Sequence, residues 1–164
     1  MSWPEVIAAA TEVRDRLAGL GVPSFVKTSG GKGLHLVSPL RPRADWHAVK
    51  SFAKGVADAM EADSPERFVA TITKSKQRGR ILVDYLRNGR GAIAVAAYST
   101  RARPEAPVSM PLGWEELGPG LGPAYFTVTN SVARLANLKA DPWADFRASA
   151  VPLPVGKSRH RRAA

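Results

Sequence analysis

The sequence of 164 residues contains no cysteine, which excludes disulfide bonds, thiolate zinc sites and cysteine nucleophiles. It also has no apolar run that approaches the roughly 18 residues of a membrane-spanning helix. The N-terminal segment lacks the basic start of a secretory signal and carries Glu5, Glu12 and Asp15. We therefore expect a helix at this end, a cytoplasmic location and no membrane partner.

Acidic residues are scarce, with 14 Asp and Glu against 24 Lys and Arg, and the formal net charge is +10. Such an excess favours polyanionic partners, which are nucleic acid, nucleotides or an acidic membrane surface. The alternative is that part of the charge belongs to a solvated tail. We expect one domain, residues 1–149, followed by a basic, disordered tail over residues 150–164.

The order of predicted elements mixes helices and strands. Ser2 and Glu5 form a capping box for a first helix, and Asp45 caps a second. Between these helices, residues 24–27 and 34–38 have strand character, and their pairing would place the intervening glycines in a turn. From Ser64 toward Lys76 we expect a helix, with a strand at 71–73 as the alternative. A central strand is expected at 80–85, and further strands at 92–97 and 125–128. Short helices are expected at 114–117, from Asn130 to Asn137, and from Asp141. We predict an α+β or α/β class.

The loop Ser29-Gly30-Gly31-Lys32-Gly33 is the first candidate binding element. Its glycines let the backbone amides approach an anion, Ser29 adds a hydroxyl donor and Lys32 adds a charge. The loop is not a P-loop, because Val26 stands where that motif needs glycine and Gly33 stands where it needs serine or threonine. A plain glycine hairpin turn is the alternative interpretation.

His35 follows the loop on a predicted strand between Leu34 and Leu36. Strand alternation puts its side chain on the opposite face from these leucines. A histidine satisfied by a core hydrogen bond is the plain interpretation. Beside a phosphate-binding loop, however, its imidazole could donate to a triphosphate oxygen.

Asp84 ends the apolar run from Ile81 to Val83. A buried carboxylate is costly unless it is paired or bound to a metal, so either a neighbouring arginine or a hard cation such as Mg²⁺ or Mn²⁺ would suit it. The sequence has no Asp-x-Asp pair between apolar residues that could supply further carboxylates, and one carboxylate does not make a two-metal site.

Basic residues cluster along the second half of the chain. Arginine suits bidentate phosphate contacts, whereas a solvated face is the alternative, and the more natural one for the two lysines. Arg87 lies three residues after Asp84, close enough to face the same site. The cluster consists of Lys74, Lys76, Arg78, Arg80, Arg87, Arg90, Arg101 and Arg103.

Four separated motifs resemble the polymerase domain of bacterial DNA ligase D, a member of the archaeo-eukaryotic primase superfamily. They are SGGKGLHL, GRILVDYLRNGRG, YSTRARPEAPVSMPLGWEEL and LKADPWADF. The resemblance implies an α+β domain with a mixed or antiparallel sheet flanked by helices. It also implies a DNA-repair nucleotidyltransferase that adds nucleotides to DNA ends with Mn²⁺ or Mg²⁺ in Ku-dependent end joining.

The resemblance assigns roles to individual residues. Ser29 and His35 match the motif that binds the triphosphate of the incoming nucleotide, with Lys32 in the same loop. Asp84 matches the last of three metal-binding aspartates, so Asp84 and His35 are the candidate catalytic residues. Arg87, Arg101 and Arg103 match basic residues around the nucleotide phosphates.

The chain departs from the family in length, because the family domain is about twice as long and its Asp-x-Asp metal motif has no counterpart here. We therefore expect the C-terminal half of such a domain, inactive alone. Its expected partners are a nucleoside triphosphate, DNA and a separate N-terminal half, ligase module or Ku. The alternatives are a non-catalytic remnant that binds nucleotide or DNA phosphates, and a truncated gene product.

Overall fold

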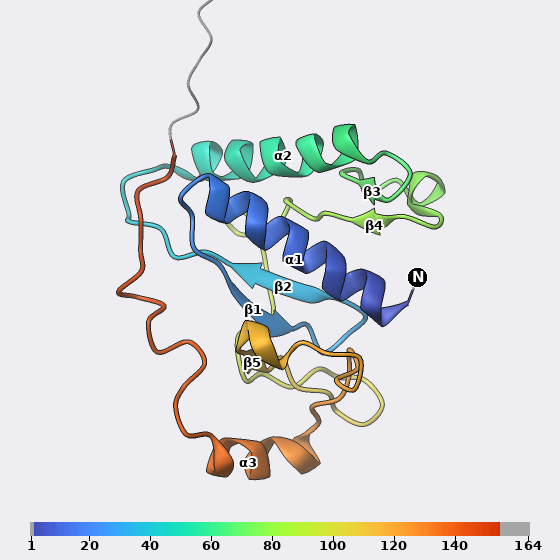
Figure 1. The fold of residues 1–164 in the computed structure, drawn as a ribbon, viewed down its shortest axis with the longest axis vertical. Helices are drawn as coiled ribbons and strands as arrows, with labels where there is room; N and C mark the ends of the chain where they lie inside the picture. Colours follow the sequence, from blue (N-terminus) through green and yellow to red (C-terminus); the bar gives the residue numbers. More distant parts are fainter. Residues whose placement is uncertain (1, 155–164) are drawn as a thin grey trace, which may run out of the picture.

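The computed structural model describes residues 2–154, and these residues form a mixed α/β fold, as predicted (Figure 1). The elements in chain order are α1 (Trp3–Gly19), β1 (Phe25–Thr28), β2 (Leu34–Val37), α2 (Trp46–Asp63), β3 (Phe68–Val69), the 3₁₀ turn η1 (Lys74–Gln77), β4 (Ile81–Leu82), β5 (Pro111–Leu112), the 3₁₀ turn η2 (Trp114–Glu116) and α3 (Val128–Asn137). None of the helices in this described part is long and apolar enough to span a membrane.

The main sheet is antiparallel and has the order β2-β1-β5, so β1 is its central strand. Phe25 pairs with Val37 and Thr28 with Leu34, which places the glycine-rich loop in the turn between β1 and β2. This confirms the predicted hairpin, with the first strand shifted by one residue. On the other side of β1, Val26 pairs with Leu112 of β5.

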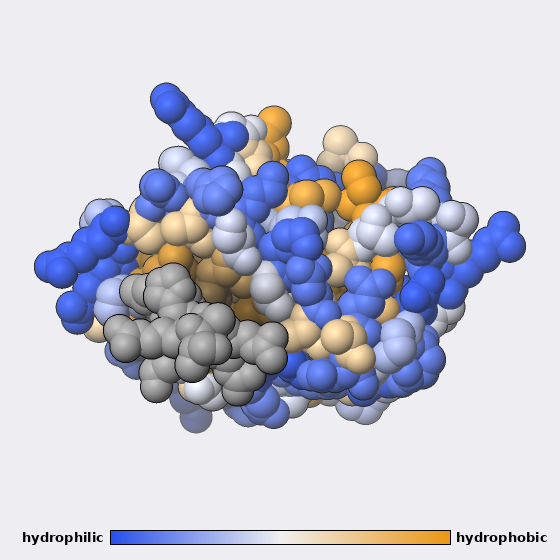
Figure 2. Space-filling view, turned by 90° about the horizontal axis from the view of Figure 1, so that it is seen from above, coloured by the Kyte–Doolittle hydropathy of each residue, from blue (hydrophilic) through white to orange (hydrophobic). Residues whose placement is uncertain are grey.

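Two helices cover one end of the molecule (Figure 1). In α1 the Glu5 carboxylate accepts hydrogen bonds from the Ser2 backbone N–H and hydroxyl, and in α2 the Asp45 side chain accepts from the Ala48 N–H at 2.7 Å. Both predicted caps are therefore confirmed. Figure 2 shows the α2 end as a largely hydrophilic surface with smaller apolar areas between the polar side chains.

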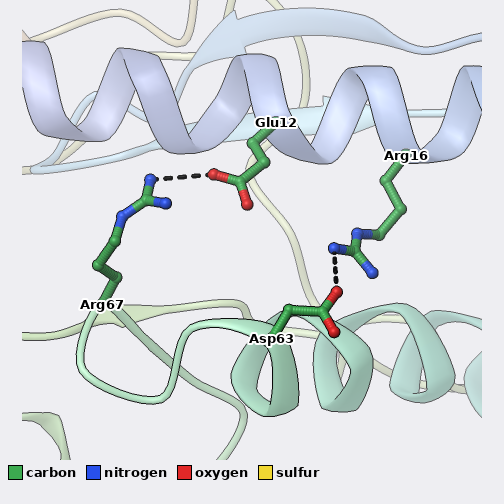
Figure 3. A network of polar contacts seen from close by, with 4 residues as sticks. All are labelled: Glu12, Arg16, Asp63 and Arg67. Carbon is green, nitrogen blue, oxygen red and sulfur yellow. Dashed lines mark hydrogen bonds and ion pairs between the residues drawn. The ribbon is translucent and has the colours of Figure 1, made fainter.

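Two ion pairs connect α1 to the segment at the end of α2 (Figure 3). Glu12 pairs with Arg67 at 2.9 Å, and Arg16 pairs with Asp63 at 2.6 Å. Beneath them lies a small apolar core, in which Ala9, Met60 and Phe68 are buried and Val13, Ile81 and Val83 pack at its edge. The ion pairs thus flank the apolar contact that brings the two helices together.

A second and larger core lies on the main sheet. Val26 of β1 packs with residues from the long segment that follows β4, and this core includes Val108, Met110, Leu112 and Phe126. The Pro- and Gly-rich stretch therefore wraps the core as an ordered loop, as predicted, and Trp114 lies in the predicted short helix η2. Sequence-distant residues thus meet β1 on the sheet that carries the candidate site.

Several predicted elements are wrong between residues 64 and 97. The chain after Ser64 makes no helix; it makes a turn, the two-residue strand β3 and the turn η1, because Phe68 and Val69 are fully buried in an extended conformation. The expected central strand 80–85 is reduced to β4, which pairs only with β3, in parallel. Residues 92–97 form no strand.

The C-terminal part also differs from the prediction. Residues 125–128 are not a strand, because Thr127 makes only a single bridge with Pro107. Thr127, rather than Asn130, is the N-cap of α3. Asn130 lies inside the helix, and its side chain accepts a hydrogen bond from the Thr127 N–H. Residues 142–149 form turns rather than a helix. Val151, which lies in the predicted tail, makes a bridge to Leu40. Residues 155–164 of that tail lie outside the described residues.

Candidate functional site

The glycine-rich loop is held in shape by Ser29. Its backbone N–H donates to the carbonyl oxygen of Gly33 at 3.2 Å, and its hydroxyl donates to the same oxygen at 2.7 Å. Gly30 has a φ of +61°, a left-handed conformation that favours glycine. The Ser29 hydroxyl therefore closes the loop in this structure, which is a role that the sequence did not indicate.

Two of the predicted arginines pack on this loop. Arg101 donates from Nη1 to the carbonyl oxygen of Ser29 at 3.1 Å, and its own N–H donates to Pro107 at 2.8 Å. A Cβ at position 31 would lie 3.5 Å from Nη1 of Arg103, whose side chain is exposed. The small glycines thus allow the side chains of Arg101 and Arg103 to lie beside the loop.

Lys32 is exposed at the tip of the loop. No hydrogen bond or ion pair ties its side chain to the arginines or to His35. The structure therefore places Lys32 in the predicted loop without bringing it to the other candidate residues.

His35 lies on β2 opposite Lys27 of β1, and Lys27 Nζ is 3.0 Å from His35 Nδ1. Burial lowers the pKa of His35 to about 4, with further lowering by the charges of Lys27 and Arg101 and a smaller one by Arg87, while Asp84 opposes them. The imidazole is therefore neutral near pH 7. A neutral ring can donate one hydrogen bond to an anion, but it carries no charge of its own.

The position and burial of Asp84 differ from those predicted. It lies two residues beyond the end of β4, and its side chain is 37% exposed, so it is not a buried carboxylate on a central strand. Its Oδ1 accepts from the Leu86 N–H at 2.9 Å, and Oδ2 lies 3.8 Å from Nε of Arg87. The predicted proximity of Asp84 and Arg87 is confirmed, although the pair is long and solvated.

The two halves of the site are close enough to interact. Arg101, Asp84 and Arg87 lie near enough to His35 for their charges to act on its pKa. Arg87 is held there by a hydrogen bond from Nη1 to the carbonyl oxygen of Ile93 at 2.8 Å. The positive charges of Arg101 and Arg87 exceed the negative charge of Asp84 near His35, which favours an anionic ligand.

Sequence reasoning missed Lys27 and Ser109. Lys27 is 4% exposed, and its Nζ lies 2.7 Å from the Ser109 hydroxyl. The alternation of residues in the predicted hairpin could have placed Lys27 opposite His35, since both fall on strands that the sequence does predict. Ser109 carried no such signal, because it reaches the site from a loop more than seventy residues away in the chain.

A divalent metal pair is a poor fit to the described residues. Within residues 2–154, no group of three or more His, Asp or Glu side chains comes together. Asp84 is a suitable oxygen ligand for one hard cation, but two ions about 4 Å apart need more carboxylates than one. We therefore assign no chemical step to a metal centre built by this chain alone.

Residues 1–143 match the family model of the LigD primase-polymerase domain. The chain belongs to this family. It is 43% identical over 147 residues to the multifunctional non-homologous end joining protein LigD of Pseudomonas aeruginosa, covering 89% of this chain and 18% of that protein. It is 37% identical over 148 residues to LigD of Mycobacterium tuberculosis, covering 86% of this chain and 20% of that protein.

The fold of this LigD-family chain is similar to that of a solved structure, the polymerase domain of Mycobacterium tuberculosis ligase D in complex with DNA. The TM-score is 0.80 and the sequence identity 32%, over 92% of this chain and 52% of that chain. The chain thus spans about half the length of the solved domain. The resemblance stated from the motifs, and the fold class that it implied, are both confirmed.

Proposed function

We propose that this chain provides the triphosphate-binding side of a nucleotidyltransferase that adds nucleotides to DNA ends during non-homologous end joining. The observation that carries the proposal is the convergence of Arg101 and Arg103 on the Ser29–Gly33 loop, with His35 and Arg87 in the same region. Guanidinium groups, loop amides and a neutral imidazole are all hydrogen-bond donors. Together they suit the several oxygens of a triphosphate.

The names of the relatives support the biological setting. Two of them are LigD proteins of non-homologous end joining, and the solved relative is a polymerase domain in complex with DNA. We therefore propose DNA as the second partner, with contacts that neutralise phosphates rather than read bases. The ligase module and Ku would be further partners of the complete repair enzyme.

The proposed cation is Mn²⁺ or Mg²⁺ accompanying the triphosphate, with Asp84 as the one carboxylate that this chain offers. The other acidic ligands would come from a different polypeptide segment. On this proposal the chain binds and orients the nucleotide, and chemistry requires the complementary part of the site. A second candidate function is nucleotide or DNA-phosphate binding without chemistry, which the exposure of Asp84 favours.

Calorimetry tests the binding proposal, with a deoxynucleoside triphosphate and Mn²⁺ titrated into the full chain. Arg103→Ala and Arg87→Ala should each weaken binding by about tenfold, because each removes a charged hydrogen-bond donor. Lys139→Ala is the matched control, since it removes the same charge from an exposed position just after α3. Equal weakening in all three variants would reduce the proposal to non-specific charge attraction.

A competition experiment separates the two candidate functions. A nucleotide-binding site of the polymerase type should prefer a nucleoside triphosphate in the presence of DNA with a recessed 3′ end. A site that binds phosphates without chemistry should bind inorganic triphosphate equally well, with no gain from the DNA. Primer extension in the presence of a complementing polypeptide decides whether the bound nucleotide is also used.

A further inference from the structure

Lys27 is a buried cation with a complete set of acceptors. Its Nζ lies 2.7 Å from Ser109 Oγ, 2.9 Å from the carbonyl oxygen of Val95 and 3.0 Å from His35 Nδ1. An ammonium group has three N–H donors and no acceptor, so each donor finds a partner inside the protein. Lys27 therefore has no donor left for a bound nucleotide, unlike the exposed Arg87 and Arg103.

The directions of these hydrogen bonds are fixed by the neighbours. The Ser109 hydroxyl donates its proton to the carbonyl oxygen of Thr28 at 2.7 Å, so the Ser109 oxygen is an acceptor toward Lys27. The Val95 carbonyl can only accept. The remaining N–H of the ammonium points to His35, where Nδ1 can accept only if it carries no proton.

We propose that Lys27 is a positioning residue that holds His35 as the neutral tautomer protonated on Nε2, which makes the ring a fixed hydrogen-bond donor to a phosphate oxygen. The tautomer follows from the contacts within this chain. That the donor serves a phosphate rests on the proposed function. The cross-strand pairing of residues 27 and 35 places the two side chains side by side.

The arrangement also limits what His35 can do. Its pKa of about 4 means that the ring is not an imidazolium near neutral pH, since burial and the charges of Lys27 and Arg101 disfavour the charged form, and the ring keeps only its Nε2 proton. His35 would therefore bind and orient a triphosphate rather than act as a general acid. This narrows the catalytic role that the family resemblance suggested for His35.

Nitrogen-15 NMR of the full chain tests the tautomer directly. The chain has 3 histidines, and loss of one set of ring signals in His35→Gln assigns His35. We expect an unprotonated shift for Nδ1 and a protonated shift for Nε2 in the unmodified protein below the pKa of Lys27, which is lowered to about 8 by burial and by Arg101. A protonated Nδ1 would overturn the proposal.

Two variants at position 27 separate the hydrogen bond from the charge. Lys27→Met removes both, and His35 should become a mixture of tautomers with triphosphate binding weakened about tenfold. Lys27→Gln removes the charge but keeps an N–H₂ donor, so it should retain the Nε2 tautomer and recover most of the binding. An unchanged tautomer in Lys27→Met would overturn the proposal.

The outcomes also separate this inference from the proposed function. A tautomer that depends on Lys27 in a protein that binds no triphosphate supports the positioning of His35 and overturns the proposed function. If Lys27→Met does not fold, the unmodified protein and Lys27→Gln still decide the matter. Both must then show the Nε2 tautomer, and Nδ1 protonation in either one contradicts the role of Lys27.

Discussion

Gly30 and Arg101 lie in direct contact, and the contact leaves no room for a side chain on Gly30. A Cβ at position 30 would lie 2.7 Å from Arg101 Cγ and 3.2 Å from the carbonyl oxygen of Pro107. The same glycine has a φ of +61°. Two independent constraints thus require glycine at the point where the loop meets the arginine that binds Ser29.

Gly30→Ala should lower the free energy of unfolding by about 1–3 kcal/mol, because it adds backbone strain and displaces Arg101. Triphosphate binding should weaken with it. Gly33→Ala is the matched control, since a Cβ there meets nothing within 4 Å and the backbone is not left-handed. Urea denaturation of both variants, followed by calorimetry, measures the effect. Equal losses in the two would contradict the contact.

The stability of the fold should depend on pH through His35. Its pKa is about 4 in the folded protein, lowered by burial first, then by Lys27, Arg101 and Arg87 against the opposing charge of Asp84. In the unfolded chain the pKa of histidine is about 6.5. Between these values the unfolded state binds a proton that the folded state does not, so the free energy of unfolding falls as the pH is lowered from about 6.5 to about 4.

Urea denaturation at about pH 7.5 and about pH 5 measures this fall. His35→Gln should show a smaller decrease than the unmodified protein, because the titrating group is gone. His47→Gln provides the control, since His47 is exposed on α2. Other groups contribute equally to all three proteins. A decrease of the same size in His35→Gln would show that His35 does not carry the effect.

The ion pair between Arg134 and Glu116 should stabilise the attachment of α3. Two guanidinium nitrogens lie 2.7 and 2.9 Å from the two carboxylate oxygens, and both side chains are partly buried. Burial would raise the pKa of Glu116, but the hydrogen bonds from Arg134 and the Gly113 N–H, with the Arg134 charge, bring it below its ordinary value. The carboxylate is therefore ionised and paired.

Arg134→Met should cost about 2 kcal/mol of unfolding free energy, because it leaves the partly buried Glu116 charge without its partner. Asp58→Asn is the comparison, since Asp58 pairs with Lys54 at 2.6 Å on the exposed face of α2. That change should cost less than about 0.5 kcal/mol. Chemical denaturation of both variants measures the difference, and similar costs would contradict a special role for the partly buried pair.

The parts of the fold that the sequence predicts well are those with local causes. The caps at Ser2 and Asp45 and the hairpin around the glycine loop depend on neighbouring residues, and all three are found. The run from Ile81 to Val83 has strong strand character, yet β4 has only two residues. Its pairing is set by the small core under α1 and α2, which sequence pattern does not reveal.

In the candidate site, too, the local relationships could be predicted from the sequence and the tertiary ones could not. The loop and His35 are local in sequence, and their relation follows from the hairpin. Arg87 was predicted to lie close to Asp84 because the two are three residues apart, and its Nε lies 3.8 Å from Asp84 Oδ2. Lys27 and Ser109 become partners only because β5 and the segment before it fold onto β1. A contact that depends on the order of strands in a sheet leaves no signature in either segment alone.

Residues 1–164 alone should not extend a primer, even with Mn²⁺. Within residues 2–154 no three His, Asp or Glu side chains come together, and a single carboxylate such as Asp84 does not fix two cations in the geometry that in-line displacement requires. The measurement is a gel assay with a recessed DNA end and the four deoxynucleotides. Triphosphate binding by the same preparation serves as the control that the chain is folded and its loop intact.

A second polypeptide that supplies the missing acidic residues should restore extension if this chain contributes the nucleotide side of the site. Asp84→Asn should then abolish activity while changing stability by less than about 0.5 kcal/mol, since the side chain is solvated and asparagine keeps an oxygen acceptor for the Leu86 N–H. Asp58→Asn, an exposed carboxylate on α2, should leave the restored activity unchanged. Robust extension by the chain alone would contradict the incomplete site, because all metal ligands would then have to come from its own residues.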